Sequence, residues 1–169
     1  GIMPDLIACG KGISSSLPIA AVIGRKDILG LYPAGSMTST HSGSPLPVVA
    51  ALASLELITR EKLVENSAKL GKILVPEVIR IAAKYAALGC AQGKGLVAGI
   101  QCVKPGTTEP DPAVALAIVE KCLQGGVLMF APVGIAGECV KIAPPLVINE
   151  DALRESIQVL EDACDAVLG

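Results

Sequence analysis

The stretch that decides the fold covers residues 4–25 and reads PDLIACGKGISSSLPIAAVIGR. Two apolar runs, Leu6 to Cys9 and Ile19 to Ile23, lie on either side of a turn rich in glycine and serine. Continuous apolar runs of this length predict short strands that are buried on both faces. Lys11 follows the first run almost directly and stands between two glycines. The sequence therefore predicts a lysine at the end of a buried strand.

A lysine in that position can take part in covalent chemistry. Its amine becomes a better nucleophile when it is partly desolvated, and it can then form a Schiff base with an aldehyde. Gly12 has no side chain, which allows the backbone and a planar ligand to approach each other closely. Gly-Lys-Gly alone is equally compatible with a solvated lysine in a turn, so the wider pattern has to decide between the two interpretations.

Strand-like and helical stretches alternate along the rest of the chain, which is typical of an α/β protein. Asp111 and Asn149 precede two of the helical stretches and are expected to cap them. The expected helices cover 25–31, 45–58, 61–88 with a possible kink at Pro76, 112–124 and 150–168, and the expected further strands cover 95–103, 127–130 and 139–143.

The composition excludes several classes of protein. Hydrophobic residues make up 51% of the chain and charged residues 18%, which favours a buried core over disorder. The net charge of -2 and the scarcity of aromatic residues argue against nucleic-acid binding. No apolar stretch is long and uninterrupted enough to predict a membrane-spanning helix. Six cysteines without a C-x-x-C pair and a single histidine predict no metal site, reduced thiols and a cytoplasmic location.

Four segments carry a resemblance to a known family. Residues 4–25 closely resemble the lysine motif of the class III pyridoxal-phosphate-dependent aminotransferases, the ornithine/4-aminobutyrate type. The segment Thr40–Leu46 (THSGSPL) resembles the family's phosphate-binding segment, and residues 93–100 (GKGLVAGI) resemble the start of its C-terminal lobe. Residues 140–146 (VKIAPPL) resemble a fourth family segment, and all four occur in the family's order.

The resemblance implies an α/β chain of the fold-type I pyridoxal-phosphate-dependent transferases. Residues 1–58 would be the C-terminal part of the large cofactor-binding domain, residues 59–88 a connecting helix, and residues 89–169 the small C-terminal domain. The implied activity is transamination, which moves an amino group from an amine or amino acid to a 2-oxo acid. The family also implies a homodimer or a higher oligomer.

The resemblance also assigns roles to particular residues. Lys11 would be the catalytic lysine that binds pyridoxal 5'-phosphate as a Schiff base. Thr40 would contact the cofactor phosphate across the dimer interface, and Ser42 of the same segment is a further cofactor-binding candidate. Lys141 stands where many members have an arginine that contacts the substrate carboxylate, and lysine cannot make the same two-pronged contact.

Several alternatives remain open at this stage. Racemase, aminomutase, decarboxylase and phospholyase activities occur on the same scaffold, and a non-catalytic interaction fragment is the rival from another class. In the family, the phosphate loop, the ring-stacking aromatic and the aspartate that pairs with the pyridine nitrogen all precede the lysine. We therefore expect these 169 residues to be inactive alone and to require the N-terminal portion of the enzyme.

Overall fold

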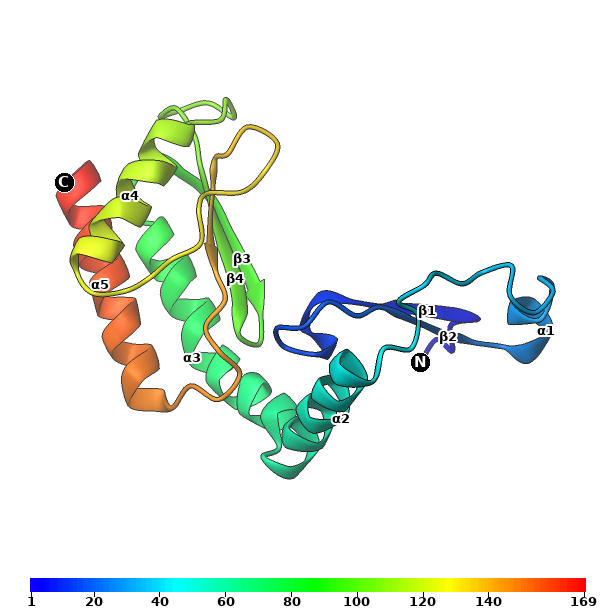
Figure 1. The fold of residues 1–169 in the computed structure, drawn as a ribbon. Coiled ribbons are helices and arrows are strands. Elements are labelled where there is room, and N and C mark those ends of the chain that lie inside the picture. The colour runs from blue at the N-terminus through cyan, green and yellow to red at the C-terminus, as the bar shows by residue number, and fades with distance from the viewer. The chain divides into compact units, whose positions relative to one another are not determined.

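The computed structural model describes residues 1–169, which divide into two compact units, Gly1–Lys62 and Leu63–Gly169. Each unit is described by itself (Figure 1). No helix in either unit is both long and apolar enough to cross a membrane. The assignment of residues 1–58 to a large domain and of 89–169 to a small one stays a prediction.

The first unit is built on a β-hairpin. Strands β1 (Leu6–Cys9) and β2 (Ala21–Gly24) pair antiparallel, with Leu6 opposite Gly24, and the short 3-10 helix η1 (Lys11–Ile13) lies in the loop between them. Helices α1 (Lys26–Leu29) and α2 (Pro45–Arg60) follow. The prediction that these strands are buried on both faces is wrong within these residues, because Ile7 is 46% and Val22 57% exposed. A two-stranded hairpin has no neighbouring strand or layer to cover its apolar side chains.

The second unit is a three-stranded antiparallel sheet with three helices on one side (Figure 1). Ala98, Ile100 and Cys102 point from the central strand into the core, and the residues between them are more accessible, as the two-residue period of a strand requires. The strands in spatial order are β3 (Leu88–Lys94), β4 (Val97–Cys102) and β5 (Cys139–Ile142), and the helices are α3 (Leu63–Ala82), α4 (Pro112–Gln124) and α5 (Glu150–Leu168).

Helix capping in this unit follows the sequence closely. The side chain of Asp111 accepts a hydrogen bond from the Val114 N–H at 3.2 Å, and that of Asn149 accepts one from the Ala152 N–H at 2.8 Å. Both predicted caps are therefore confirmed. Helix α3 continues through Pro76 and ends at Ala82, six residues before the predicted end, because Leu88 already pairs with Cys102 in the sheet.

The strand predictions for this unit have mixed outcomes. The predicted strand over 95–103 is confirmed as β4, and only its first residues, Gly95 and Leu96, form a tight turn instead. The partner strand β3 was not predicted, because its glycines and polar residues resemble a loop. The predicted strand over 127–130 lies outside the sheet. Val127 and Met129 pack against the core instead, and only Val133 beyond them exchanges backbone hydrogen bonds with Cys139, at 2.8 and 2.9 Å.

Glycines allow α3 to approach the sheet closely. A Cβ atom on Gly71 would overlap the backbone of Gly95, which itself has a φ of +58° in the β3–β4 turn. The Ser67 hydroxyl accepts a hydrogen bond from the Leu96 N–H at 3.1 Å at the same point. The turn that sequence reasoning did not predict is thus fixed by a helix that it did predict.

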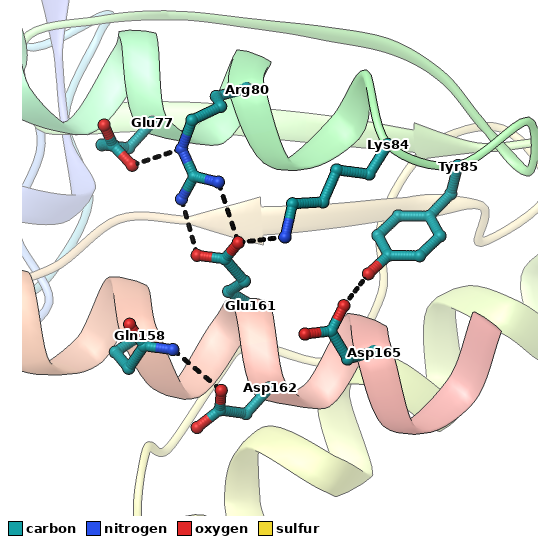
Figure 2. A network of polar contacts seen from close by, with 8 residues as sticks. All are labelled: Glu77, Arg80, Lys84, Tyr85, Gln158, Glu161, Asp162 and Asp165. Atoms are coloured by element: carbon teal, nitrogen blue, oxygen red, sulfur yellow. Dashed lines mark hydrogen bonds and ion pairs between the residues drawn. The ribbon is translucent and has the colours of Figure 1, made fainter. Parts of the chain in front are cut away.

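Ion pairs join α3 to α5 on the surface of this unit (Figure 2). The Arg80 guanidinium donates two hydrogen bonds to the Glu161 carboxylate, at 2.6 and 2.8 Å, and the Lys84 ammonium donates a third. These hydrogen bonds lower the pKa of Glu161 from 4.5 to about 2. The Tyr85 hydroxyl donates to Asp165 one turn further along α5, which raises the pKa of the tyrosine to about 12.

Candidate active site

Lys11 begins η1, directly beyond β1, in a turn that is held firmly in place. Its φ of +48° lies in the left-handed region, which side-chain-bearing residues rarely adopt and which costs of order 1 kcal/mol. The Ser14 hydroxyl, which is buried, donates a hydrogen bond to the Leu17 carbonyl, and the Ile13 N–H donates to the Gly10 carbonyl at 3.2 Å. Strained residues of this kind are found at functional sites, and Ser15 of the same turn, with a φ of +68°, shares this conformation.

The space beside Lys11 is open. A Cβ atom placed on Gly10 or on Gly12 would meet no other atom of the chain within 4 Å. The Lys11 side chain is exposed and makes no ion pair with a carboxylate. This part of the site therefore has room for a planar ligand attached to the lysine amine, which fits the implied cofactor. Helix η1 also contacts helix α2 (Figure 1).

The segment 40–43 precedes helix α2 and carries the two phosphate-binding candidates. The Ser42 hydroxyl accepts a hydrogen bond from the Ser39 N–H at 2.9 Å and lies 3.2 Å from the Ser39 hydroxyl, so it is engaged within the turn. No hydrogen bond engages the Thr40 hydroxyl, which can therefore bind an anion. Gly43, with a φ of +68°, lets the chain turn into the helix.

The start of α2 offers fewer anion-binding groups than an ordinary helix. Pro45 and Pro47 have no N–H, and the Val48 N–H donates to the Ser44 carbonyl at 3.4 Å. Leu46 is the one residue of the first turn whose N–H is free. A bound phosphate would therefore receive most of its hydrogen bonds from Thr40 and its neighbours in the turn, and few from the N–H groups at the start of α2.

Lys141 belongs to the second unit, where it lies in β5 at the edge of the sheet. Its ammonium nitrogen is 4.7 Å from the centroid of the Phe130 ring, a cation–π contact. Lys141 forms no ion pair with an acidic side chain. A half-buried cation without a protein counter-ion is suited to bind a carboxylate from a ligand.

The three buried cysteines and the one buried acid have structural roles. Burial raises the pKa of the thiols of Cys102 and Cys164 to about 12 and of Cys122 to about 11, which makes these thiols poor nucleophiles. Glu138 is the one buried acid. Its carboxylate accepts hydrogen bonds from its own N–H and from that of Ala136, which lower the pKa of the carboxyl. These hydrogen bonds also fix the loop before β5. No cluster of His, Cys, Asp and Glu side chains has the geometry of a metal site.

Two residues that contribute to the candidate site were not identified from the sequence. Ser14 is one of three consecutive serines, and no local signal distinguishes the one that is buried and fixes the lysine turn. Phe130 was assigned to a strand, and only the folded chain shows its ring beside Lys141. The fact that it is the only phenylalanine in the chain is the one hint that the sequence offered.

Similar solved structures place this fold among the pyridoxal-phosphate-dependent transferases of fold type I. A phospholyase from Arthrobacter, solved in complex with phosphoethanolamine, matches with a TM-score of 0.88 and 28% identity over 98% of this chain and 39% of that one. Among curated proteins, a probable 4-aminobutyrate aminotransferase of Bacillus subtilis is 37% identical over 95% of this chain and 37% of its own length. An isoleucine 2-epimerase of Lentilactobacillus buchneri is 35% identical over 98% of this chain and 36% of its own length.

The family model for Aminotransferase class-III matches residues 1–164, nearly the whole chain. This protein belongs to the class-III aminotransferase family, whose members depend on pyridoxal phosphate. The resemblance that the sequence motifs carried and the predicted fold class are both confirmed. The chain spans somewhat more than a third of the length of the relatives it matches.

Proposed function

We propose that this chain forms part of a pyridoxal-phosphate-dependent aminotransferase in which Lys11 is the catalytic lysine. The observation that carries the proposal is the backbone at Lys11, a left-handed lysine between two glycines with open space beside it, within the matched family region. When bound, pyridoxal phosphate would supply an aldehyde for amino-group exchange and a ring that withdraws electrons. The substrates would be an amino donor and a 2-oxo acid acceptor.

Each candidate residue of this chain would have a separate role. Lys11 would hold the cofactor covalently, and its amine, once free, would carry the proton between the substrate carbon and the cofactor. The Thr40 hydroxyl would donate to the cofactor phosphate, in a homodimer to the cofactor of the other subunit. Ser42 would fix the turn that presents Thr40, because its own hydroxyl is engaged with Ser39. Lys141 would bind the substrate carboxylate.

We propose further that these 169 residues do not turn over substrate by themselves. Efficient catalysis requires an acidic group that keeps the cofactor's ring nitrogen protonated. The two carboxylates closest to Lys11 in the sequence, Asp5 and Asp27, both pair with Arg25, at 3.1 and 2.7 Å. Residues outside this chain would have to provide the acidic partner, in agreement with the greater length of the relatives.

The replacement Lys11→Ala tests the proposal in the complete enzyme. We expect it to lower the rate of amino transfer by at least about a thousandfold, because the proton carrier and the covalent anchor are both lost. Lys26→Ala is the matched control, since Lys26 is an exposed lysine of the same unit with no ion pair, and it should leave the rate unchanged. Amino transfer by Lys11→Ala at a rate close to that of the unaltered enzyme would refute the assignment.

The Thr40 assignment has its own test. Thr40→Ala should weaken the binding of pyridoxal phosphate by about tenfold, the loss of one hydrogen bond to a charged phosphate. Thr38→Ala removes a threonine from the same loop whose hydroxyl donates weakly to the Ser39 carbonyl at 3.4 Å, and it should bind the cofactor normally. Equilibrium dialysis measures both, and equal affinities for the two variants would exclude Thr40 as a phosphate contact.

Racemisation is the second candidate function. The similarity to an isoleucine 2-epimerase at 35% identity favours it specifically, since that relative is almost as similar as the aminotransferase. The two activities differ in whether an acceptor is consumed. Stoichiometric loss of a 2-oxo acid for each amino donor supports transamination, and inversion of the donor without an acceptor supports racemisation.

A further inference from the structure

A cavity of about 710 Å³ lies in the second unit, beside β5 and between two extended segments. Residues 126–131 form one wall and residues 141–145 the other, and side chains of α5 form part of the floor. The volume falls in the range of small-molecule sites in proteins, roughly 300–1,000 Å³. The cavity exists because the segment over 127–131 packs beside the sheet without pairing with β5.

The cavity is lined by apolar groups and a single charged side chain. Lys141 is its only ionisable residue, and Ser156 is the only other lining residue with a polar side chain. The Ser156 hydroxyl already donates to the Ala152 carbonyl at 2.7 Å, within its own helix. All other lining residues are apolar or glycine, among them Leu153, Ile157 and Leu160 of α5. The cavity therefore offers one positive charge and otherwise apolar surface.

Phe130 fixes the position of that charge. Its ring lies 4.7 Å from the Lys141 ammonium and lines the same cavity. An ammonium held over a ring face keeps hydrogen-bond donors free, because the π-system does not accept them as a carboxylate would. Since Lys141 has no acidic partner in the chain, the charge remains available to a ligand.

The geometry points to a binding site for a monocarboxylate with an aliphatic or aromatic body. The carboxylate binds the Lys141 ammonium, and the body displaces water from the apolar wall and floor. A second charge on the body has no partner in the cavity, so a dicarboxylate or a diamine is disfavoured. This assignment rests on the proposed role of Lys141 as a carboxylate contact, and within the proposed function it selects amino and 2-oxo acids with apolar side chains.

Calorimetric titration of the 169-residue chain tests the site without any cofactor. The probes are hexanoate, hexan-1-ol and acetate, which separate the charge from the apolar body. We expect saturable binding of hexanoate that is at least about tenfold tighter than that of either single-feature probe. Equal affinity for hexanoate and hexan-1-ol would overturn the inference, and so would the absence of saturable hexanoate binding.

Two variants and a control locate the binding. Lys141→Met keeps the length of the side chain and should weaken hexanoate binding about tenfold, with less than about a twofold effect on hexan-1-ol. Ser156→Leu should weaken both ligands, because it fills the cavity from α5. Lys94→Met, on β3 and outside the cavity, should change neither. If Lys94→Met weakens hexanoate binding as much as Lys141→Met, the attraction is a general surface effect and the site is refuted.

The proposed role of Lys11 can be refuted without refuting this binding site. In the Lys11→Ala chain, hexanoate should bind with unchanged affinity, because Lys11 belongs to the other unit. A loss of hexanoate binding in that variant would contradict a self-contained site in the second unit. If Lys11 proves not to carry the cofactor while hexanoate still binds in the manner described, the proposed function fails and the binding site stands.

Discussion

The two units of the chain differ sharply in how much of themselves they bury. Residues 63–169 contain almost the whole core, including Ile100, Ile118 and Val140 with no exposed surface at all. In residues 1–62 the buried side chains are those of Ala51 and Ser14, and most of the large apolar side chains of β1, β2 and α2 are exposed. The second unit is thus stabilised by its own contacts, whereas the first holds the lysine turn with little core beneath it. The candidate catalytic lysine thus lies in the unit with little core, and most of the buried contacts lie in the other unit.

This difference indicates how each half depends on its surroundings. Burial of apolar area stabilises a fold by about 25 cal/mol for each Å². Apolar area that remains in solvent therefore contributes nothing to the stability of the fold. The exposed strands of the first unit have no further layer within this chain, which spans 37% of the length of the Bacillus subtilis relative. The second unit buries its sheet without a further layer. Changes in the two units should therefore have unequal consequences for stability.

Paired core and surface substitutions test the contrast most strongly. Leu153→Ala removes a side chain that is 1% exposed on α5 and should lower the free energy of unfolding by about 2–5 kcal/mol. Leu52→Ala, at a residue of α2 that is 55% exposed, should change it by less than about 0.5 kcal/mol. Urea unfolding followed by circular dichroism measures both. Equal losses in the two variants would remove the distinction between the units.

Helix caps provide a smaller test of the same contrast. Asn149→Ala deletes the hydrogen bond to the Ala152 N–H and should destabilise the second unit by about 1 kcal/mol. Ser44 occupies the corresponding position before α2, but its side chain makes no capping bond. Ser44→Ala should therefore cost only a few tenths of a kcal/mol. A loss at Ser44 as large as that at Asn149 would show that α2 is capped after all.

The smallest expected effect concerns the ion pairs between α3 and α5. Because the pKa of Glu161 is lowered to about 2 in the folded chain, its contribution is complete above the unfolded value of 4.5 and disappears as the pH falls towards 2. Glu161→Gln should cost about 0.5–1 kcal/mol near neutral pH and progressively less in acid. Thermal unfolding across this pH range measures the difference from the unaltered chain.

Glu155→Gln is the matched control for this test, since Glu155 is exposed on the same helix and forms no ion pair. It should show no pH-dependent difference of that kind. A Glu161→Gln deficit that stays constant down to about pH 2 would mean that the carboxylate does not act through its charge.

Sequence reasoning succeeded where the signal is local or carried by family motifs. The caps at Asp111 and Asn149 follow from residue type and position, and the lysine motif identified the family before any fold was known. It failed at β3 and at residues 127–130, where tertiary contacts decide between strand and extended loop. A segment rich in glycine pairs because β4 lies beside it, and an aliphatic segment remains unpaired because its side chains reach the core.

The candidate site shows the same limit. Lys11, Thr40, Ser42 and Lys141 could be named from motifs, and their roles remain proposals. The contacts that could modulate these residues were invisible in the sequence. The buried Ser14 hydroxyl and the Phe130 ring lie three and eleven positions from the lysines that they support, and no periodic pattern predicts either contact.

The position of the covalent cofactor link tests the central claim most directly. The holoenzyme that contains residues 1–169 is reduced with borohydride, digested, and its peptides are mapped by mass spectrometry. Attachment of the cofactor to Lys11 predicts a phosphopyridoxyl group on the peptide that carries Lys11 and on no other lysine of the chain. A fully loaded enzyme with unmodified Lys11, or with the group on Lys26 or Lys141, would contradict it.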